Sequence, residues 1–171
     1  NANLTWETSE QIDLGLDMRF LNNRLSATID YFDKKTKDLL IGITPPIEFG
    51  PSSTTINGGT VLNRGLELEV SWKDQVGDFA YGVSANFSTL KNQVLELPAG
   101  VPRIERSDAS STNYQIATAF EPGYPVWYLR GYNYEGVDEE GKPIITDVDG
   151  NGTIDAGDKM FIGQGIPTYT Y

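Results

Sequence analysis

Apolar and polar residues alternate along four stretches of the first 90 residues, and a period of two predicts β-strands. The expected strands cover approximately residues 11–21, 24–33, 64–73 and 79–90. One face of the first strand is apolar, with Ile12, Leu14, Leu16, Met18 and Phe20. No segment shows a helical period, so the pattern predicts an all-β fold with antiparallel strands.

The expected strands are about ten residues long, which matches the 9–11 residues that a tilted membrane-spanning strand needs. The faces opposite the apolar ones carry charged residues, namely Asp13, Asp17, Arg19, Asp30, Glu67 and Glu69. Aromatic residues near strand ends lie where interfacial girdles form, namely Phe20, Tyr31, Trp72 and Phe79. This pattern suits a barrel with lipid outside and water inside. A soluble sandwich whose apolar faces meet fits the alternation equally well.

The lengths of the connections favour the barrel. Short links fall near residues 21–24 and 74–78, and long links cover approximately 34–63 and 91–167. Outer-membrane barrels alternate short periplasmic turns with long extracellular loops. The two long links are therefore expected to face the outside of the cell.

Composition removes several classes of function. The 171 residues carry 24 Asp and Glu against 13 Lys and Arg, a net charge of −11, which argues against a nucleic-acid partner. The chain has no Cys and no His, so cysteine nucleophiles, Ser-His-Asp triads and the usual zinc sites are excluded. Carboxylate pairs such as Glu67 and Glu69 could in principle serve a glycosidase, but a water-filled barrel is lined by such residues anyway. We expect no enzyme.

Several motifs, in order along the chain, resemble SusC/RagA-type TonB-dependent transporters. Residues 4–17 contain the pattern L-x-W-E-x-x-x-Q-x-x-x-G-L-D. Residues 57–68 resemble the family's N-x-G and N-x-G-x-E patterns, with Asn57-Gly58-Gly59 and Asn63-Arg64-Gly65-Leu66-Glu67. Asp149-Gly150-Asn151-Gly152 and Ile162-Gly163 continue the match, so the resemblance covers nearly the whole chain.

The resemblance implies that residues 1–171 are part of the β-barrel domain of a large outer-membrane transporter of a Gram-negative bacterium. It implies a barrel of about 22 strands, with an N-terminal plug absent from this segment. It also implies import of oligosaccharides or peptides, a SusD-like lipoprotein partner, contact with outer-membrane lipid, and energy from the TonB system through the missing plug. The alternative is a soluble cell-surface β-sandwich that binds carbohydrate and holds a structural calcium.

An aromatic run lies inside the second long link. The candidate substrate-binding residues are Tyr124, Trp127, Tyr128 and Tyr132. Sugar rings present flat C–H faces that stack on aromatic rings, so these residues suit a glycan importer. Alternatively, the rings pack the loop onto the barrel rim or against the lipoprotein.

A twelve-residue run, Asp147 to Asp158, has the spacing of a calcium-binding loop. The expected ligands are Asp147, Asp149, Asn151, Thr153 through its backbone carbonyl, Asp155 and Asp158. Gly152 stands at position six, where such loops turn sharply. Position twelve is Asp instead of Glu and no flanking helices are expected, so a solvated turn without metal is the alternative. The calcium, if bound, is expected to be structural.

Overall fold

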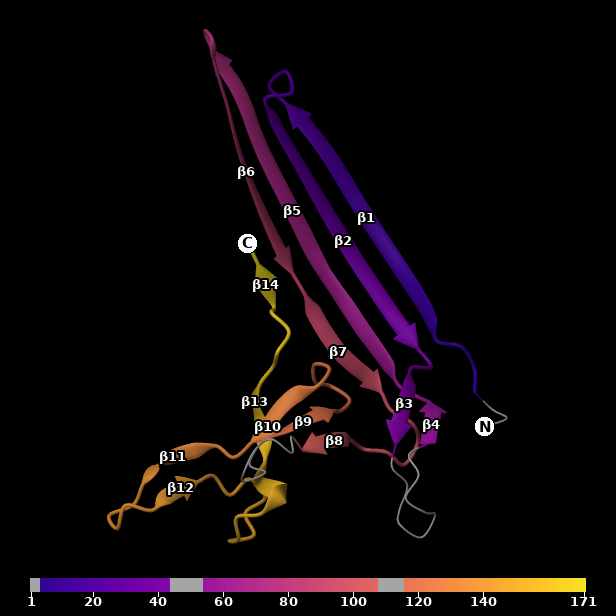
Figure 1. Cartoon of the computed structure of the whole chain (residues 1–171), viewed down its shortest axis with the longest axis vertical. Coiled ribbons are helices and arrows are strands. Elements are labelled where there is room, and N and C mark those ends of the chain that lie inside the picture. Colours follow the sequence, from indigo (N-terminus) through magenta and orange to yellow (C-terminus); the bar gives the residue numbers. More distant parts are fainter. Residues whose placement is uncertain (1–3, 44–53, 108–115) are drawn as a thin grey trace.

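The computed structural model describes residues 4–43, 54–107 and 116–171. Its main element is one antiparallel sheet in the order β1–β2–β5–β6–β14, with β7 also pairing with β5 (Figure 1). The members are β1 (Thr8–Phe20), β2 (Leu25–Lys37), β5 (Thr60–Val76), β6 (Phe79–Thr89), β7 (Lys91–Glu96) and β14 (Tyr169–Thr170). The long strands run side by side, with the hairpin turns at one end and the connecting segments at the other (Figure 1).

Two tight turns join the long strands at the hairpin end. Leu21, Asn22 and Asn23 have φ angles of 54°, 57° and 65°, and the Arg24 amide donates to the Leu21 carbonyl at 3.3 Å. Asparagine tolerates the left-handed region better than most residues, which explains why this polar stretch can reverse the chain so abruptly. Gly77, with φ of 61°, reverses the chain between β5 and β6. The short links expected from the sequence are therefore hairpin turns.

The pairing register keeps apolar residues beside apolar residues across four strands. One row on the apolar face consists of Leu16, Ile29, Leu68 and Phe87. The adjacent row on the other face consists of Asp17, Thr28, Glu69 and Asn86. A slip of one residue would move every side chain to the opposite face. The alternation therefore specifies the register as well as the strands.

The apolar face of this sheet is uncovered. Leu14, Leu16, Phe79 and Val83 are 64%, 57%, 70% and 68% exposed. Within the described residues no second sheet packs against this face, whereas the soluble sandwich considered from the sequence requires its two apolar faces to meet. An uncovered apolar face opposite a charged one is the arrangement expected for a section of barrel wall whose apolar side meets lipid.

The two long links contain more structure than the alternation pattern indicated. The first link, expected at residues 34–63, includes a hairpin of β3 (Leu40–Ile43) and β4 (Thr54–Asn57). The second, expected at 91–167, begins with β7, which keeps the register of β6 on β5. It then forms a four-stranded sheet in the order β13–β10–β9–β8 and a β11–β12 hairpin. Strands of four residues are too short for a clear period of two, which explains why the sequence reasoning missed them.

These further elements lie at the connecting end of the long strands (Figure 1). Their bounds are β8 (Ile104–Ser107), β9 (Ala117–Phe120), β10 (Tyr128–Gly131), β11 (Tyr134–Val137), β12 (Pro143–Ile145), the 3₁₀ turn η2 (Ala156–Asp158) and β13 (Met160–Gly163). We call the sheet of β8, β9, β10 and β13 the loop sheet. No helix in the described part of the chain has the length and apolar character needed to cross a membrane.

The loop sheet shares a small core with the ends of the long strands. Val61 of β5, Val94 of β7 and Phe120 of β9 are 7%, 0% and 5% exposed. Partly buried apolar residues pack around them, namely Leu39, Ile41, Leu97, Ile104, Val126 and Trp127. Val61 lies an even number of residues from Glu67 and Glu69 on β5, so it belongs to the charged, lumen-side face. The loop sheet is therefore attached to the inner side of the barrel wall.

Candidate functional site

Backbone hydrogen bonds join the second link to the free edge of β7. The Val94 amide donates to the Tyr124 carbonyl at 2.8 Å, and the Gly123 amide donates to the Val94 carbonyl at 2.8 Å. The Gln93 side chain donates to the Gly123 carbonyl at 3.2 Å. The segment around Gly123 therefore takes the place of a neighbouring strand, which fixes the aromatic run relative to the barrel wall.

Asn92 reinforces this junction with its side chain. Its Nδ2 donates to Asn63 Oδ1 at 2.7 Å, and its Oδ1 accepts the Val126 amide at 2.7 Å. Asn92 is half-buried and lies opposite Asn63 on the lumen-side face. One amide side chain thereby connects β5, β7 and the loop segment that precedes β10.

Tyr124 and Tyr128, two of the four candidate aromatic residues, stack on each other. Their ring centroids lie 4.5 Å apart, and Phe161 of β13 lies 6.0 Å from Tyr124 and 5.6 Å from Tyr128. Tyr124 is 39% exposed, whereas Tyr128 is 2% exposed. The Tyr124 ring is partly accessible to solvent, and the buried Tyr128 ring packs against it.

Trp127 and Tyr132 lie apart from that stack. Trp127 is half-buried, packs against Phe120 at a centroid distance of 5.5 Å, and has the Arg106 guanidinium 4.3 Å above its ring. The Tyr132 ring is half-buried, with the Lys159 ammonium 5.6 Å from its centroid. The structure thus places Trp127 with the shared core and gives Tyr132 a cation on one face.

A partly buried polar network involves Arg130 and Tyr128 of β10. Arg130, 6% exposed, pairs with Glu105 and donates to the Lys159 carbonyl. The Tyr128 hydroxyl donates to Glu121, and burial together with this carboxylate raises the pKa of Tyr128. A tyrosine held neutral in this way keeps donating its hydrogen bond at every physiological pH. The network fixes β10 relative to β8 and β13.

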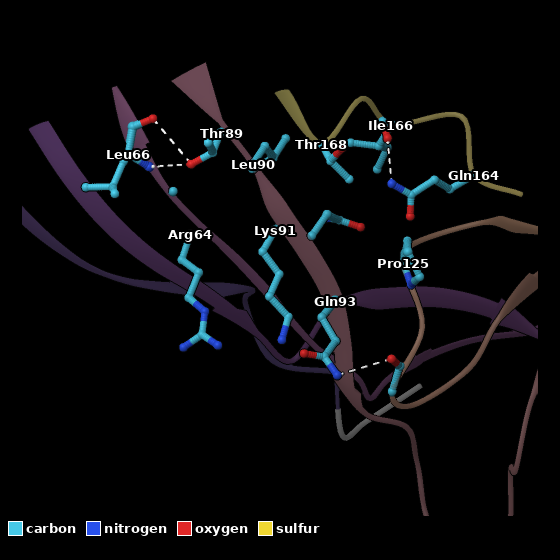
Figure 2. Close-up of a pocket in the computed structure, with 13 residues that line it drawn as sticks. Arg64, Leu66, Thr89, Leu90, Lys91, Gln93, Pro125, Gln164, Ile166 and Thr168 are labelled. Atoms are coloured by element: carbon cyan, nitrogen blue, oxygen red, sulfur yellow. Dashed lines mark hydrogen bonds between the residues drawn. The ribbon is translucent and has the colours of Figure 1, made fainter. Parts of the chain in front are cut away.

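A hollow of about 520 Å³ opens between β7 and the returning segment at residues 164–168. Figure 2 shows Arg64, Lys91 and Gln93 on one side of it, and Pro125, Gln164 and Ile166 on the other. A second hollow, of about 500 Å³, lies over the lumen-side core and is lined in part by Arg106, Phe120 and Trp127. Arg106, which the sequence did not single out, therefore lines the space beside the aromatic run together with Asn92.

The acidic run brings three of its six expected ligands together. Carboxylate oxygens of Asp147, Asp149 and Asp158 all lie within 4.8 Å of one another. Asp147 also accepts the amides of Gly150 at 2.7 Å and Gly152 at 2.8 Å, which curls the chain around its carboxylate. Both glycines have positive φ, 71° and 81°, a conformation that side-chain-bearing residues rarely adopt.

Two of the remaining expected ligands, Asn151 and Asp155, accept backbone amides through their side chains, and so does the grouped Asp158. Asn151 Oδ1 accepts the Thr153 amide at 2.7 Å, and Asp155 Oδ1 accepts the Gly157 amide at 2.6 Å as the cap of η2. Asp158 is fully buried and accepts the amides of Val148 and Asp155, both at 2.8 Å. Hydrogen bonds from these amides hold the pKa of Asp158 below its ordinary value despite its burial. The three grouped carboxylates of Asp147, Asp149 and Asp158 form an oxygen-rich donor set that fits a hard cation such as calcium.

Comparison with known proteins identifies the class. The family model described as TonB dependent receptor-like, beta-barrel matches residues 1–170, and the chain belongs to this family. Members of this family are outer-membrane β-barrel proteins of Gram-negative bacteria. The relatives of this chain are transporters and receptors, which is consistent with a non-enzymatic role.

Two curated relatives place the chain more narrowly, with the SusC/RagA type. It is 33% identical to TonB-dependent receptor P3 of Formosa agariphila over 99% of the chain and 19% of that relative. It is 36% identical to TonB-dependent receptor SusC of Bacteroides thetaiotaomicron over 93% of the chain and 17% of that relative. The chain spans about a fifth of the length of these relatives.

Solved structures agree with the sequence relatives. The chain superposes on the RagAB peptide importer in its 'open-open' state with a TM-score of 0.75 and 28% identity. It superposes on the 'closed-closed' state with a TM-score of 0.72 and 26% identity. Each match covers 99% of this chain and 19% of the solved one. The resemblance inferred from the motifs is confirmed, and so is the fold as a section of a large transmembrane barrel.

Proposed function

We propose that this chain is the part of a SusC/RagA-type transporter that forms one section of the barrel wall and carries loop structure over its mouth. The complete transporter imports oligosaccharides or peptides across the outer membrane, driven by the TonB system. The observation that supports this most is the loop sheet, which is fixed to the lumen-side face of β5 and β7 through Val61, Val94 and Asn92. A loop held there narrows the path into the barrel.

The connecting end of the long strands, which carries the loop sheet and is called the loop end below, faces the outside of the cell in this proposal. The hairpin end has turns of two to four residues, whereas the loop end carries the β3–β4 hairpin and the loop sheet. Short periplasmic turns and long extracellular loops are the rule in outer-membrane barrels. A SusD-like lipoprotein would cover the barrel mouth at this end. The names of SusC and of the RagAB importer among the relatives support such a partner.

The aromatic rings are the proposed substrate contacts. Tyr124 and Tyr132 have ring surface available, and Trp127 is reached from the hollow over the lumen-side core. Tyr128 contributes by holding Tyr124 in place, because its own ring is buried. Stacked aromatic rings bind the apolar faces of sugars and also the side chains of peptides, so this surface suits both substrate classes.

Uptake by living cells tests the proposed function. A strain lacking the transporter gene receives either the full-length gene or its Tyr124→Ala variant, and uptake of defined oligosaccharides and peptides is measured. The full-length gene should restore uptake of one substrate class, and the variant should restore it less well. Tyr134→Ala is the matched control, because Tyr134 is 59% exposed on β11, outside the ring stack. No uptake of either class by the restored strain would contradict the proposal.

We also propose that the run from Asp147 to Asp158 binds one structural calcium ion. The spacing of the acids and the grouping of three carboxylates support it. Calcium would supply charge neutralisation to this group and no chemistry beyond it. The bound ion would stiffen the segment between β12 and β13, and through β13 and Phe161 the stacked tyrosines.

Calorimetry with calcium on the full-length transporter tests this site. The unchanged protein should release heat on binding, and Asp147→Asn/Asp149→Asn should not. Glu139→Gln/Glu140→Gln removes the same charge from the nearby β11–β12 turn and should bind as the unchanged protein does. Equal heats for all three proteins would rule the site out.

A further inference from the structure

Three cations gather on the apolar face of the main sheet, at its loop end. Arg64 of β5 lies two residues before Leu66 and four before Leu68, so its side chain belongs to the same face as theirs. Lys91 of β7 lies directly opposite Arg64. Lys35 of β2 lies opposite Leu62, which places it diagonally beside Arg64. We call Lys35, Arg64 and Lys91 the basic triad.

The basic triad begins where the apolar band stops. The last apolar row towards the loop end holds Leu14, Tyr31 and Leu66, and the next row holds Ile12, Asp33, Arg64 and Lys91. On β5 the band runs from Leu66 to Trp72, and no cation interrupts it. The triad therefore stands at the border of the hydrocarbon layer, at the depth of lipid headgroups.

The triad has few partners inside the protein. All three side chains are exposed, and those of Arg64 and Lys91 make no hydrogen bond or ion pair within residues 4–43, 54–107 and 116–171. Figure 2 shows Arg64 and Lys91 extending side by side along the rim of the hollow beside β7. Like charges directly opposite each other destabilise a sheet, with Cβ atoms only about 5 Å apart. An anion between these two side chains would remove that repulsion.

Acidic residues on the same face offset the charge only in part. Asp33 lies opposite Arg64, and Glu10 lies opposite Lys35 but forms its ion pair with Lys37 at 2.6 Å. Counting Lys35, Lys37, Arg64 and Lys91 against Glu10 and Asp33 leaves this part of the face positive. The chain as a whole has a net charge of −11, so the local excess of cations runs against its composition.

We propose that the basic triad binds the phosphate of a phosphorylated glycolipid in the outer leaflet. The occupant follows from position and charge: the surface adjoins the lipid-covered band, and guanidinium and ammonium groups pair well with phosphate. The assignment to the outer leaflet rests on the proposed orientation of the loop end. The lipid would anchor β5 and β7 next to the junction that holds the loop sheet.

Native mass spectrometry of the full-length transporter in detergent tests this proposal, with diphosphoryl lipid A as the probe. Lys35→Gln/Arg64→Gln is compared with Lys34→Gln/Lys73→Gln, which removes two charges from the same two strands on the lumen-side face. Loss of two headgroup-contacting cations should weaken lipid A binding about 30-fold. The lumen-side variant should bind as the unchanged protein does. A second variant, Lys91→Gln alone, should weaken lipid A binding about fivefold. This single variant still tests the site if the double variant does not assemble.

Two further probes decide the source of the phosphate. Phosphatidylglycerol and inorganic phosphate should bind the unchanged protein more weakly than lipid A. Equal binding of either one would overturn the assignment to a glycolipid, and equal lipid A binding by the unchanged and triad variants would overturn the site. Lipid binding is measured without transport, so a failure here is distinct from a failure of the uptake experiment.

Discussion

The long strands and the loop sheet of this chain obtain their stability in opposite ways. The long strands expose their apolar residues, with Leu14 and Val83 64% and 68% exposed. The loop sheet buries apolar residues of its own, with Ala119 and Phe120 0% and 5% exposed. Burial from water stabilises a soluble core, whereas a membrane strand needs lipid on its apolar face and partners for every backbone group. The same chain therefore contains one section adapted to lipid and one adapted to water.

The largest effect is expected from emptying the loop core. Phe120→Ala should destabilise the loop sheet by about 3–5 kcal/mol, because it removes a buried ring that packs on Val61, Val94 and Trp127. Hydrogen exchange in the full-length transporter should show faster exchange of residues 117–131, with the long strands unchanged. Ile116→Ala, at a 46% exposed position beside β9, is the control and should have little effect. Faster exchange throughout β5 and β6 would show that the two regions are not separate.

The second prediction concerns the lipid-covered face. Leu68→Arg places a charge in the middle of the apolar band and should cost about 2–4 kcal/mol of barrel stability. Resistance of the folded barrel to heating in detergent measures the loss. Ser71→Arg lies on the other face of β5, opposite Ser26 and Ser84, and should be tolerated. Equal losses from both variants would contradict the assignment of the two faces.

A smaller effect is expected at the junction between the two regions. Asn92→Ala removes the acceptor of the Val126 amide and the donor to Asn63, and an unpaired buried group costs about 1–3 kcal/mol. The cost should appear as faster proteolysis between Gly123 and Tyr128, with the barrel intact. Asn86→Ala is the matched control, since Asn86 is exposed on β6. Unchanged proteolysis in Asn92→Ala would mean that the junction depends on the backbone bonds at Val94 alone.

The smallest effect concerns pH. Burial and the Glu121 carboxylate raise the pKa of Tyr128, so the folded loop keeps this proton when the unfolded loop has lost it. The stability of the loop should therefore be independent of this group below about pH 10 and should fall as the pH rises further. Ultraviolet absorbance of tyrosinate, compared between the unchanged protein and Tyr128→Phe, should show no difference through about pH 10. A difference that appears there would mean that Tyr128 is accessible to solvent.

Prediction from sequence succeeded where a long period of two was present. The alternation in β1 and β5 indicated both the strands and the face that each residue takes, since Leu16 and Leu68 lie in one row and Asp17 and Glu69 in the next. Strand ends were less accurate. β5 begins at Thr60, four residues before the expected start, because buried Val61 and Leu62 interrupt the alternation.

The candidate site was only partly predictable. Aromatic composition indicated a ring cluster, but the exposure of Tyr124 and the burial of Tyr128 depend on Phe161, which lies 33 residues further along the chain than Tyr128. The contacts of the Asn92 side chain could not be inferred from the sequence, because its partners belong to β5 and to the loop. Asp155 fits the calcium spacing, yet it caps η2 in the structure. Long-range packing decided each of these cases.

One face of the long strands meets lipid and the other meets water, and cysteine labelling tests this assignment of the faces most directly. The chain has no cysteine, so Leu68→Cys and Glu69→Cys each introduce a single thiol into this section of the transporter. In intact outer membranes, we predict that a charged, membrane-impermeant maleimide labels Glu69→Cys and leaves Leu68→Cys unlabelled, whereas an apolar maleimide labels Leu68→Cys. Labelling of Leu68→Cys by the charged reagent to the same extent as Glu69→Cys would contradict the account.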